Sequence, residues 1–279
     1  MGPGAALPAG TALTVARDLP GPAARDERFA LAWNLLDRAD ELSAAAFRSG
    51  GYEMWTKADG SPVTDVDTRV EDMLTGGIRA AFGADSVLAE EGGVTPGDSV
   101  QWVIDPLDGS ANFIEGIPIY AHMVALLRAG SPVFALVSSP VLGRRWWAYR
   151  GCGAFERTRR VSASTTARLE EARIAYGGLR DYDPPSLDGL VRLIRRCMRS
   201  RGFGNFLPHM LVAEGTYDLA SSGGGGEPWD VAPLSLIVEE AGGRMTSLRG
   251  GAWNAADPVL TSNAILHDEA LPIVNGNAG

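Results

Sequence analysis

The chain has 279 residues, of which 45% are hydrophobic, so it is long enough to bury a large core in one domain or in two closely packed halves. Its net charge is −9, from 25 basic and 34 acidic residues, which argues against bulk electrostatic binding of nucleic acids. The two cysteines, Cys152 and Cys197, have neither zinc-site spacing nor a disulfide framework, so we expect a reducing, cytoplasmic location.

The first predicted segment, residues 1–25, is a disordered leader rich in Gly, Ala and Pro. It has no basic stretch at its start, and Arg17 and Asp18 interrupt its apolar residues, so it does not resemble a signal peptide. No apolar run in the sequence approaches the length of a membrane span, so we expect no membrane partner.

Residues 26–165 are predicted to form an α+β half of the molecule. Asp26 caps a predicted helix that runs to about Arg48, and Thr64 caps a second helix with apolar residues at helical spacing. Residues 57–63 between these helices are expected to form a loop. Five strands are predicted to follow, at Ser86–Ala89, Gln101–Ile104, Tyr120–Leu127, Val133–Ser138 and Arg145–Tyr149. A strand meander with helices on one side is typical of α+β proteins.

Residues 166–279 alternate between strand and helix patterns, which predicts an α/β half joined to the first near residues 157–167. Strands are expected near Ala172–Tyr176, Arg201–Gly204, Tyr217–Ala220, Gly243–Ser247 and Val259–Thr261. Helices are expected near Ser186–Met198, Pro208–Glu214 and Asp230–Ala241, and a last helix ends the chain.

The most informative motif is Trp102–Ser110, in which an apolar run ends in Asp105 and Asp108. Two carboxylates this close repel each other, an arrangement that suits a hard divalent cation with oxygen ligands. The same residues also suit an ordinary turn, since Asp, Pro and Gly all favour turns. Gly109 and Ser110 then stand at a possible helix start, where backbone N–H groups bind anions.

Three further acidic sites can join this pair, and each has an ordinary structural alternative. Glu90 and Glu91 follow a predicted strand and alternatively lie in a solvated loop. Asp67 lies three residues after Thr64 and alternatively completes a helix capping box. Asp230 precedes an apolar helix and alternatively caps it. Together these sites indicate a magnesium-dependent enzyme that acts on phosphate.

Four segments resemble, in order and rough spacing, the motif set of the inositol monophosphatase family: residues 59–67, 88–92, 102–110 and 229–232. The resemblance covers the chain from about residue 27 to residue 270. Residues 144–148, 211–215 and 240–248 look most like the actinobacterial histidinol-phosphate phosphatase subgroup. The family implies a layered αβαβα sandwich, often a homodimer, with two or three Mg²⁺ ions between the halves.

The resemblance also implies roles for individual residues. The implied metal ligands are hard oxygen donors, namely Glu90, Asp105, Asp108, Asp230 and the backbone carbonyl of Leu107. Asp67 and Ser110 match the pair that orients the attacking water, and Glu90 joins them as a catalytic residue. The N–H groups of Gly109 and Ser110 match the phosphate-binding position. The implied reaction is hydrolysis by metal-activated water, without a phospho-enzyme.

The implied substrate contacts are Ala111, Gly204, Asn205, Gly223 and Glu227. Ala111 stands where the subgroup usually has Lys, and Asn205 stands where it usually has Asp. Gly223 stands where many members have a substrate-binding Glu, and Glu227 could substitute for that group from a different position. The missing carboxylates predict weaker recognition of a cationic amine such as histidinol.

The rest of this region leaves the substrate open. The glycine run at residues 223–226 is expected to offer space for a larger group. Phe206 either stacks on a ring of the substrate or is a core aromatic. Histidinol phosphate is the nearest named substrate by resemblance. An inositol, sugar, cyclitol or nucleoside monophosphate of specialised metabolism is the alternative.

Basic residues outside the motifs give one alternative of another class, a protein that binds RNA or the transcription machinery, as some members of the family do. Arg192, Arg195, Arg196 and Arg199 form a basic stripe at helical spacing, which is also typical of a solvated helix face. His122, His209 and His267 match no catalytic position and are expected to be structural. The predicted partner is a small-molecule phosphate rather than a nucleic acid.

Overall fold

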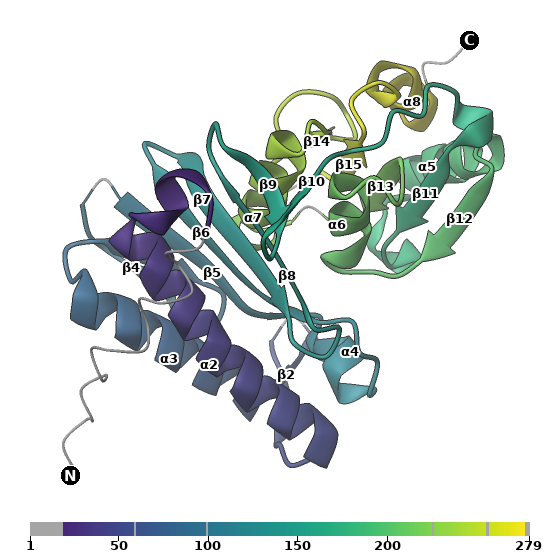
Figure 1. Cartoon of the computed structure of the whole chain (residues 1–279). Coiled ribbons are helices and arrows are strands. Elements are labelled where there is room, and N and C mark those ends of the chain that lie inside the picture. Colours follow the sequence, from purple (N-terminus) through teal and green to yellow (C-terminus); the bar gives the residue numbers. More distant parts are fainter. Residues whose placement is uncertain (1–18, 59, 99, 225, 255–256, 277–279) are drawn as a thin grey trace.

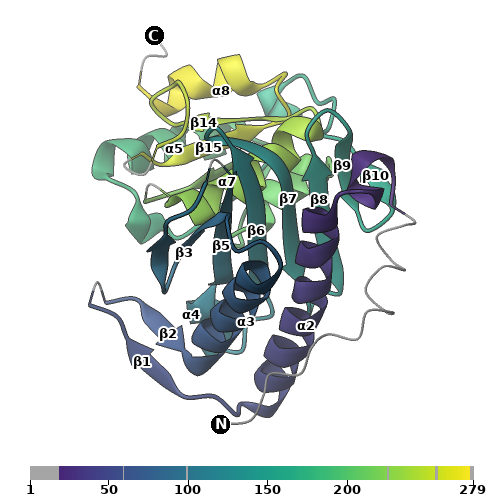
Figure 2. The same cartoon turned by 90° about the vertical axis from the view of Figure 1, so that its left-hand side faces the viewer.

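The computed structural model describes residues 19–276 except residues 59, 99, 225, 255 and 256. Helices and two large sheets alternate in layers, which confirms the predicted αβαβα sandwich (Figures 1 and 2). Residues 1–18 of the predicted leader lie outside the described residues. The folded chain begins before residue 26, because Gly21–Ala24 form a short 3-10 helix, η1, and Leu19 and Ala23 are buried in the core.

Two long helices form the first outer layer (Figure 2). Helix α2 (Glu27–Ser49) begins after Asp26, whose carboxylate accepts backbone N–H groups of the first turn, and it ends at Gly50, which has φ 66°. Helix α3 (Asp65–Ala81) begins after Thr64, whose hydroxyl accepts the N–H of Val66. Both predicted helices are confirmed, and the apolar faces of both helices pack on the first sheet.

The first sheet has eight strands in the order β10-β9-β8-β7-β6-β5-β3-β4. Their bounds are β3 Ser86–Ala89, β4 Gly93–Thr95, β5 Val100–Asp108, β6 Ala121–Arg128, β7 Ser131–Ser139, β8 Arg144–Tyr149, β9 Gly153–Glu156 and β10 Arg159–Val161. All neighbours pair antiparallel except β3 and β5, which are parallel. The five predicted strands are confirmed, whereas the short strands β4, β9 and β10 were not predicted.

Two short strands, β1 (Met54–Thr56) and β2 (Pro62–Thr64), form a hairpin that was not predicted, and the loop predicted at residues 57–63 covers its turn and the start of β2. All three side chains of β1 are exposed, so this strand lacks the apolar alternation by which strands are predicted. The turn of the hairpin contains Lys57, whose backbone N–H donates to the Ser61 carbonyl. The hairpin brings this lysine to the functional site described below.

The second sheet has the strand order β12-β11-β13-β15-β14, with β11 parallel to both of its neighbours. Its strands are β11 Arg173–Tyr176, β12 Arg199–Gly202, β13 Leu219–Ser222, β14 Arg244–Ser247 and β15 Val259–Ser262. The helices of this part are α5 Pro184–Arg196, α6 Leu207–Ala213, α7 Pro228–Glu240 and α8 His267–Val274, and 3-10 turns lie at Leu169–Glu171 (η2) and Leu179–Asp181 (η3). The predicted α/β alternation is therefore present.

Helices α6 and α7 form the middle layer between the two sheets, and α5 and α8 form the far outer layer (Figure 1). One buried cluster contains Val103 and Trp146 of the first sheet, Met210 of α6 and Leu236 of α7. Side chains from both predicted halves thus share one core, and the boundary near residue 165 stays a prediction. Among the helices described, none is both long and apolar enough to cross a membrane.

Candidate metal centre

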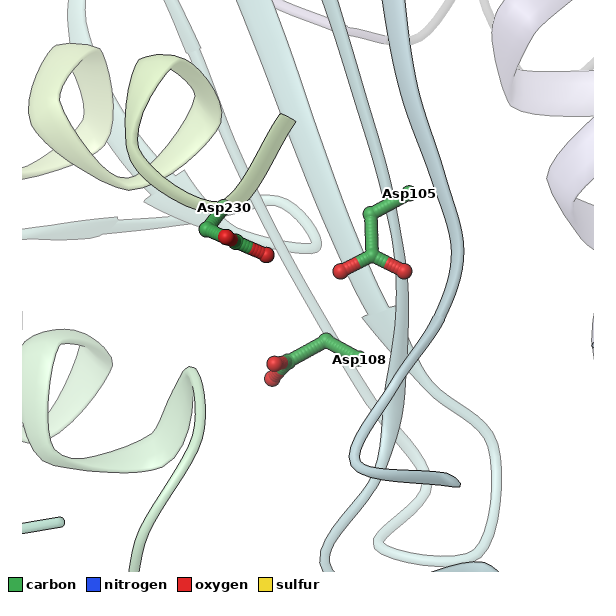
Figure 3. A group of neighbouring side chains, drawn as sticks. All are labelled: Asp105, Asp108 and Asp230. Atoms are coloured by element: carbon green, nitrogen blue, oxygen red, sulfur yellow. The ribbon is translucent and has the colours of Figure 1, made fainter. Parts of the chain in front are cut away.

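Asp105 and Asp108 lie on β5, which continues to Asp108 instead of ending at Ile104 as predicted. Residues three apart point to opposite faces of a regular strand. The pairing of β5 with β6 shifts register between Asp105 and Asp108, and this irregularity brings both carboxylates to one side (Figure 3). The Leu107 backbone N–H donates to Asp105 Oδ1 at 2.9 Å and fixes that carboxylate in place.

Asp230 comes to the same place from the first turn of α7 (Figure 3). The helix begins at Pro228 after Glu227, so the alternative prediction that Asp230 itself is the N-cap is wrong. Asp230 Oδ2 accepts the Glu227 backbone N–H at 2.8 Å. Asp105, Asp108 and Asp230 each place one carboxylate oxygen at this site, and these three oxygens lie within 4.8 Å of one another.

The three aspartates are held in an environment that disfavours their negative charge. Burial, followed by repulsion from neighbouring carboxylates such as Glu90, raises the pKa of Asp105 well above its usual value. Burial likewise raises the pKa of Asp108 to about 6 and that of Asp230 to about 7. A cation that takes oxygen ligands would remove this repulsion, so the donor set fits a hard divalent ion.

A lysine ammonium already contacts the carboxylates on one side of this cluster. Lys57 Nζ lies 2.8 Å from Glu90 Oε1 and 2.5 Å from Glu91 Oε1. The two glutamates lie in the turn after β3, and their side chains are 26% and 18% exposed, so they are only partly solvated. Lys57 was not predicted as a site residue. The position of Lys57 supports a cation site here, because its ammonium group shows that these carboxylates attract positive charge.

Asp67 and Ser110, which match the family's water-orienting pair, are hydrogen-bonded to each other. The Ser110 hydroxyl donates to Asp67 Oδ1 at 2.6 Å. Asp67 Oδ2 accepts the backbone N–H of Thr64 at 2.9 Å and the Thr64 hydroxyl at 2.5 Å, so the capping-box alternative is also correct. Because Asp67 is fully buried and held by Thr64, its second oxygen keeps a defined direction toward Ser110.

A five-residue helix, α4 (Ser110–Ile114), begins at the end of β5. Its N-cap is Gly109, which has φ 98°, and a Cβ there would lie 2.9 Å from the Ile119 carbonyl oxygen. Only glycine fits this conformation and this close approach. The carbonyl oxygen of Leu107 lies 3.1 Å from Ser110 Oγ, so the turn brings the predicted backbone ligand beside the Asp67–Ser110 pair.

Two cavities meet at the aspartate cluster. The metal-side cavity has a volume of about 210 Å³, and it is lined by Ser61, Pro62, Glu90, Asp105, Leu107, Asp108, Gly109, Ser110, Ala111, Asn205 and Asp230. A second cavity of about 170 Å³ shares Asp108, Asn205 and Asp230 with the first. Every predicted metal ligand therefore lines the metal-side cavity. Of the predicted substrate contacts, Ala111, Asn205 and Gly223 line one or both cavities, and Gly204 and Glu227 line neither.

The Gly204–Asn205 segment supports Asp108 from the second half of the chain. Asn205 has φ 56°, and its Nδ2 donates to Asp108 Oδ1 at 3.2 Å. The backbone N–H of Phe206 donates to Asp108 Oδ2 at 2.7 Å. The Phe206 ring is fully buried against Trp146, so it is a core aromatic and the stacking alternative is wrong.

The remaining predicted substrate contacts differ in how they reach the cavities. Ala111 is exposed at the border of the metal-side cavity. Glu227 is exposed at the start of α7 and lines neither cavity. Gly223 lines the second cavity, but a Cβ at this position would lie 2.5 Å from the ring of Tyr182. A side chain at position 223 would therefore meet Tyr182, while Gly223, Gly224 and Gly226 line the second cavity, so the expectation that the glycine run offers space for a larger group stays a prediction.

The three histidines are buried and hydrogen-bonded, as expected for structural residues. Their partners are Ser43 and the Pro106 carbonyl for His122, Thr261 and Ser222 for His209, and Thr246 and Ser262 for His267. His209 also lines the second cavity. Burial lowers its pKa to about 4, so the ring is neutral at pH 7.

The predicted basic stripe is interrupted. Helix α5 ends at Arg196, and Arg199 begins strand β12. Arg196 pairs with Glu269 at 3.0 Å, and Arg192 Nε donates to a backbone carbonyl of α8 at 3.3 Å. This arrangement is typical of a solvated helix face with local pairs, the structural alternative of the two predictions.

Comparisons with known proteins place this geometry in a family. The model of the inositol monophosphatase family matches residues 26–277. The histidinol-phosphatase of Mycobacterium tuberculosis is 41% identical over 256 residues, which cover 88% of this chain and 96% of that protein. The histidinol-phosphatase of Streptomyces coelicolor is 38% identical over 259 residues, with the same coverage of each chain. The solved IMPase of Thermotoga maritima superimposes with a TM-score of 0.82 at 29% identity, covering 90% of this chain and 98% of that one. The chain belongs to the inositol monophosphatase family.

Proposed function

We propose that the chain hydrolyses the phosphate monoester of a small metabolite, with Mg²⁺, at the site formed by β5, α4 and the start of α7. The observation that carries the proposal is the cluster of buried Asp105 with half-buried Asp108 and Asp230, next to the hydrogen-bonded pair of Asp67 and Ser110. Phosphoryl transfer depends on charge neutralisation and on positioning, and these two groups of residues are suited to those two tasks.

The residues that would hold two or three Mg²⁺ ions are the carboxylates of Glu90, Asp105, Asp108 and Asp230 and the carbonyl oxygen of Leu107. All are hard oxygen donors, as Mg²⁺ requires. When bound, magnesium supplies positive charge beside the phosphate and makes a water molecule more acidic. Glu90 would exchange its ion pair with Lys57 for a metal ion, so the Lys57 ammonium would compete with the metal for this carboxylate.

The remaining steps fall to groups of the protein itself. Asp67 fixes the Ser110 hydroxyl, and the two together orient the attacking water in line with the phosphorus. The backbone N–H groups of Gly109 and Ser110 hold the phosphate oxygens at the start of α4. No side chain is needed as a nucleophile, because water attacks directly.

Histidinol phosphate is the nearest named substrate that we propose. The curated relatives from Mycobacterium tuberculosis and Streptomyces coelicolor are both named histidinol-phosphatase, which supports this choice. Inositol, sugar, cyclitol and nucleoside monophosphates are the alternatives. Ala111, Asn205 and Gly223 border the space that the leaving alcohol would occupy, and Gly204 immediately precedes Asn205.

The test is phosphate release from a panel that contains histidinol phosphate, inositol 1-phosphate and a nucleoside monophosphate. We expect release with magnesium and none after chelation. Calcium should compete with magnesium without supporting turnover, because its looser coordination misplaces the reacting groups. The proposal fails if no phosphate monoester is hydrolysed, or if hydrolysis continues at the same rate after chelation.

We also propose that the chain acts in the cytoplasm as a homodimer. The free thiols of Cys152 and Cys197 are compatible with a reducing compartment. Light scattering of the purified chain tests the dimer, and a molar mass close to 29.4 kDa would instead indicate a monomer.

A further inference from the structure

The second cavity has an unusual wall for a site that must recognise a leaving group. It adjoins the aspartate cluster and is the space available next to a phosphate held there. Its wall includes the backbones of Gly178, Gly223 and Gly224, which offer no side chain. Recognition of the leaving group therefore depends on the few side chains that reach this wall.

Tyr182 explains why position 223 carries no acidic side chain in this chain. Its ring lies 2.5 Å from the position that a Cβ of residue 223 would take. The ring is only 6% exposed, and its hydroxyl donates to Ser221 Oγ at 2.9 Å, so it cannot easily move. A glutamate at position 223 would collide with this fixed ring, so a carboxylate on this wall can come only from another position.

Asp181 brings such a carboxylate from the neighbouring 3-10 turn η3. It lines the cavity and lies over Gly178, and its Cβ is 3.6 Å from the Cβ position of Gly224. Among the residues that the structure describes, no side chain forms a hydrogen bond or ion pair with the Asp181 carboxylate. It is exposed, so it is free to pair with a ligand.

The charge of the cavity favours a cation. Among the residues that the structure describes, no lysine or arginine lines this cavity. The imidazole of His209 is neutral, and its two nitrogens are hydrogen-bonded to Thr261 and Ser222. Nothing on this wall offsets the charge of Asp181, and a neutral polyol would leave its carboxylate without an ionic partner.

We propose that Asp181 is a specificity-determining residue that pairs with an ammonium group on the leaving alcohol, and that the site therefore selects cationic phosphate monoesters. This inference rests on the proposed phosphatase function and names the substrate class of the same site. Asp181 and Tyr182 act together, because the tyrosine closes position 223 while the aspartate provides the charge. The weaker recognition of amines expected from Asn205 and Gly223 is thereby offset.

The test compares L-histidinol phosphate with its desamino analogue, 3-(imidazol-4-yl)propyl phosphate, since the two differ only in the ammonium group. The measured quantity is the ratio of the two kcat/KM values. We expect the wild type to prefer histidinol phosphate and Asp181→Asn to lower the ratio by about tenfold to a hundredfold. Asp181→Glu keeps the charge and should retain part of the preference.

The matched control is Asp188→Asn, which removes the same charge from an exposed position on α5 that lines a different cavity. It should leave the ratio unchanged. Equal ratios in the wild type and Asp181→Asn, with phosphate still released from both substrates, would overturn the role of Asp181 and leave the phosphatase function standing. If no variant and no substrate gives phosphate, the proposed function itself fails, and the inference fails with it.

Discussion

At the scale of single residues, the aspartate cluster is suited to bind a cation because it is costly to maintain without one. Burial and mutual repulsion raise the pKa of Asp230 to about 7 and that of Asp108 to about 6. The backbone N–H groups of Leu107 and Phe206 hold Asp105 and Asp108 in place in spite of this repulsion. The geometry thus exists before the metal arrives.

Replacing one carboxylate of the cluster should separate activity from stability. Asp230→Asn and Asp105→Asn should each lower turnover by orders of magnitude, because each removes a metal ligand. Without metal, Asp230→Asn should melt at a higher temperature than the wild type, because it removes one charge from a cluster of mutually repelling carboxylates. Circular dichroism and phosphate release measure the two effects. Near-normal turnover in either variant at saturating magnesium would contradict the assignment.

The Asp67–Ser110 pair should behave as a unit. Ser110→Ala should lower kcat by about a hundredfold with little change in stability, because the hydroxyl is proposed to orient the water. Ser110→Thr is the matched control and should keep most of the activity, since it keeps the hydroxyl. The double variant with Asp67→Asn should lose less than the product of the two single losses. Fully multiplicative losses would mean that the two side chains act independently.

Magnesium affinity should depend on pH in the range set by the raised pKa values of the cluster. Protons compete with the metal below about pH 7 at Asp230 and below about pH 6 at Asp108. Affinity should therefore rise from pH 5.5 to pH 8, by up to about tenfold per pH unit for each proton displaced. In the metal-free protein the raised pKa values contribute stability at low pH, and this contribution is lost as the pH rises toward 7.

Titration calorimetry at four pH values measures the affinity. Asp230→Asn should flatten the pH dependence, because one of the competing protons is absent. A magnesium affinity that is equal at pH 5.5 and pH 8 would show that these carboxylates are not the ligands.

The contents of the site were only partly predictable from the sequence. Asp105 and Asp108 could be paired because only two residues separate them, and a known motif set related them to Asp230. Lys57 and Asp181 were missed, because each reaches the site through a turn whose position depends on tertiary packing. The collision between Tyr182 and position 223 could not be predicted, because no local pattern relates the two residues.

At the scale of elements, the contact between α2 and α3 depends on a pair of adjacent glycines. Gly76 has no atom within 4 Å of the position of an added Cβ. At Gly77 an added Cβ would lie 2.6 Å from the side chain of Leu35 on α2. Leu35 is almost fully buried, so it has little room to move. One glycine of the pair is required by packing and the other is not.

The two glycines therefore make a matched experiment. Gly76→Ala should raise the free energy of unfolding by about 0.5–1 kcal/mol, because alanine favours the helix and meets nothing. Gly77→Ala should lower it by about 1–3 kcal/mol, because the methyl group overpacks the contact with Leu35. Urea denaturation of the two variants and the wild type gives both values. Equal effects at both positions would contradict the helix packing described.

Element prediction succeeded where the apolar pattern was long. The helices α2 and α3 and the buried strands β6 and β7 were predicted because each contains a long apolar pattern. The hairpin strand β1 was missed because all its side chains are exposed. The prediction ended strand β5 at Ile104, because Pro106 and Gly109 both favour a turn. The strand continues irregularly through Pro106 to Asp108, and the chain turns only at Gly109.

At the scale of the whole molecule, α7 connects the layers. It packs on β6 and β7 of the first sheet through Leu236 and its neighbours, and it lies beside the second sheet at Met245. Its first turn carries Asp230 to the cluster on β5 (Figure 3). The cluster is thus complete only when the middle layer has docked on the first sheet.

That docking has a kinetic consequence. Asp105 and Asp230 are far apart in sequence, so the complete set of ligands forms only when distant parts of the chain have packed together. Such contacts are slow to form, because the chain entropy lost in closing the long loop must be overcome first. Contacts that are absent from the folding transition state slow unfolding without accelerating folding. We therefore expect magnesium to lower the unfolding rate constant and to leave the refolding rate constant nearly unchanged. Stopped-flow urea jumps with and without magnesium measure both rate constants. A faster refolding rate with magnesium would contradict this expectation, because it would mean that the ions already bind in the folding transition state.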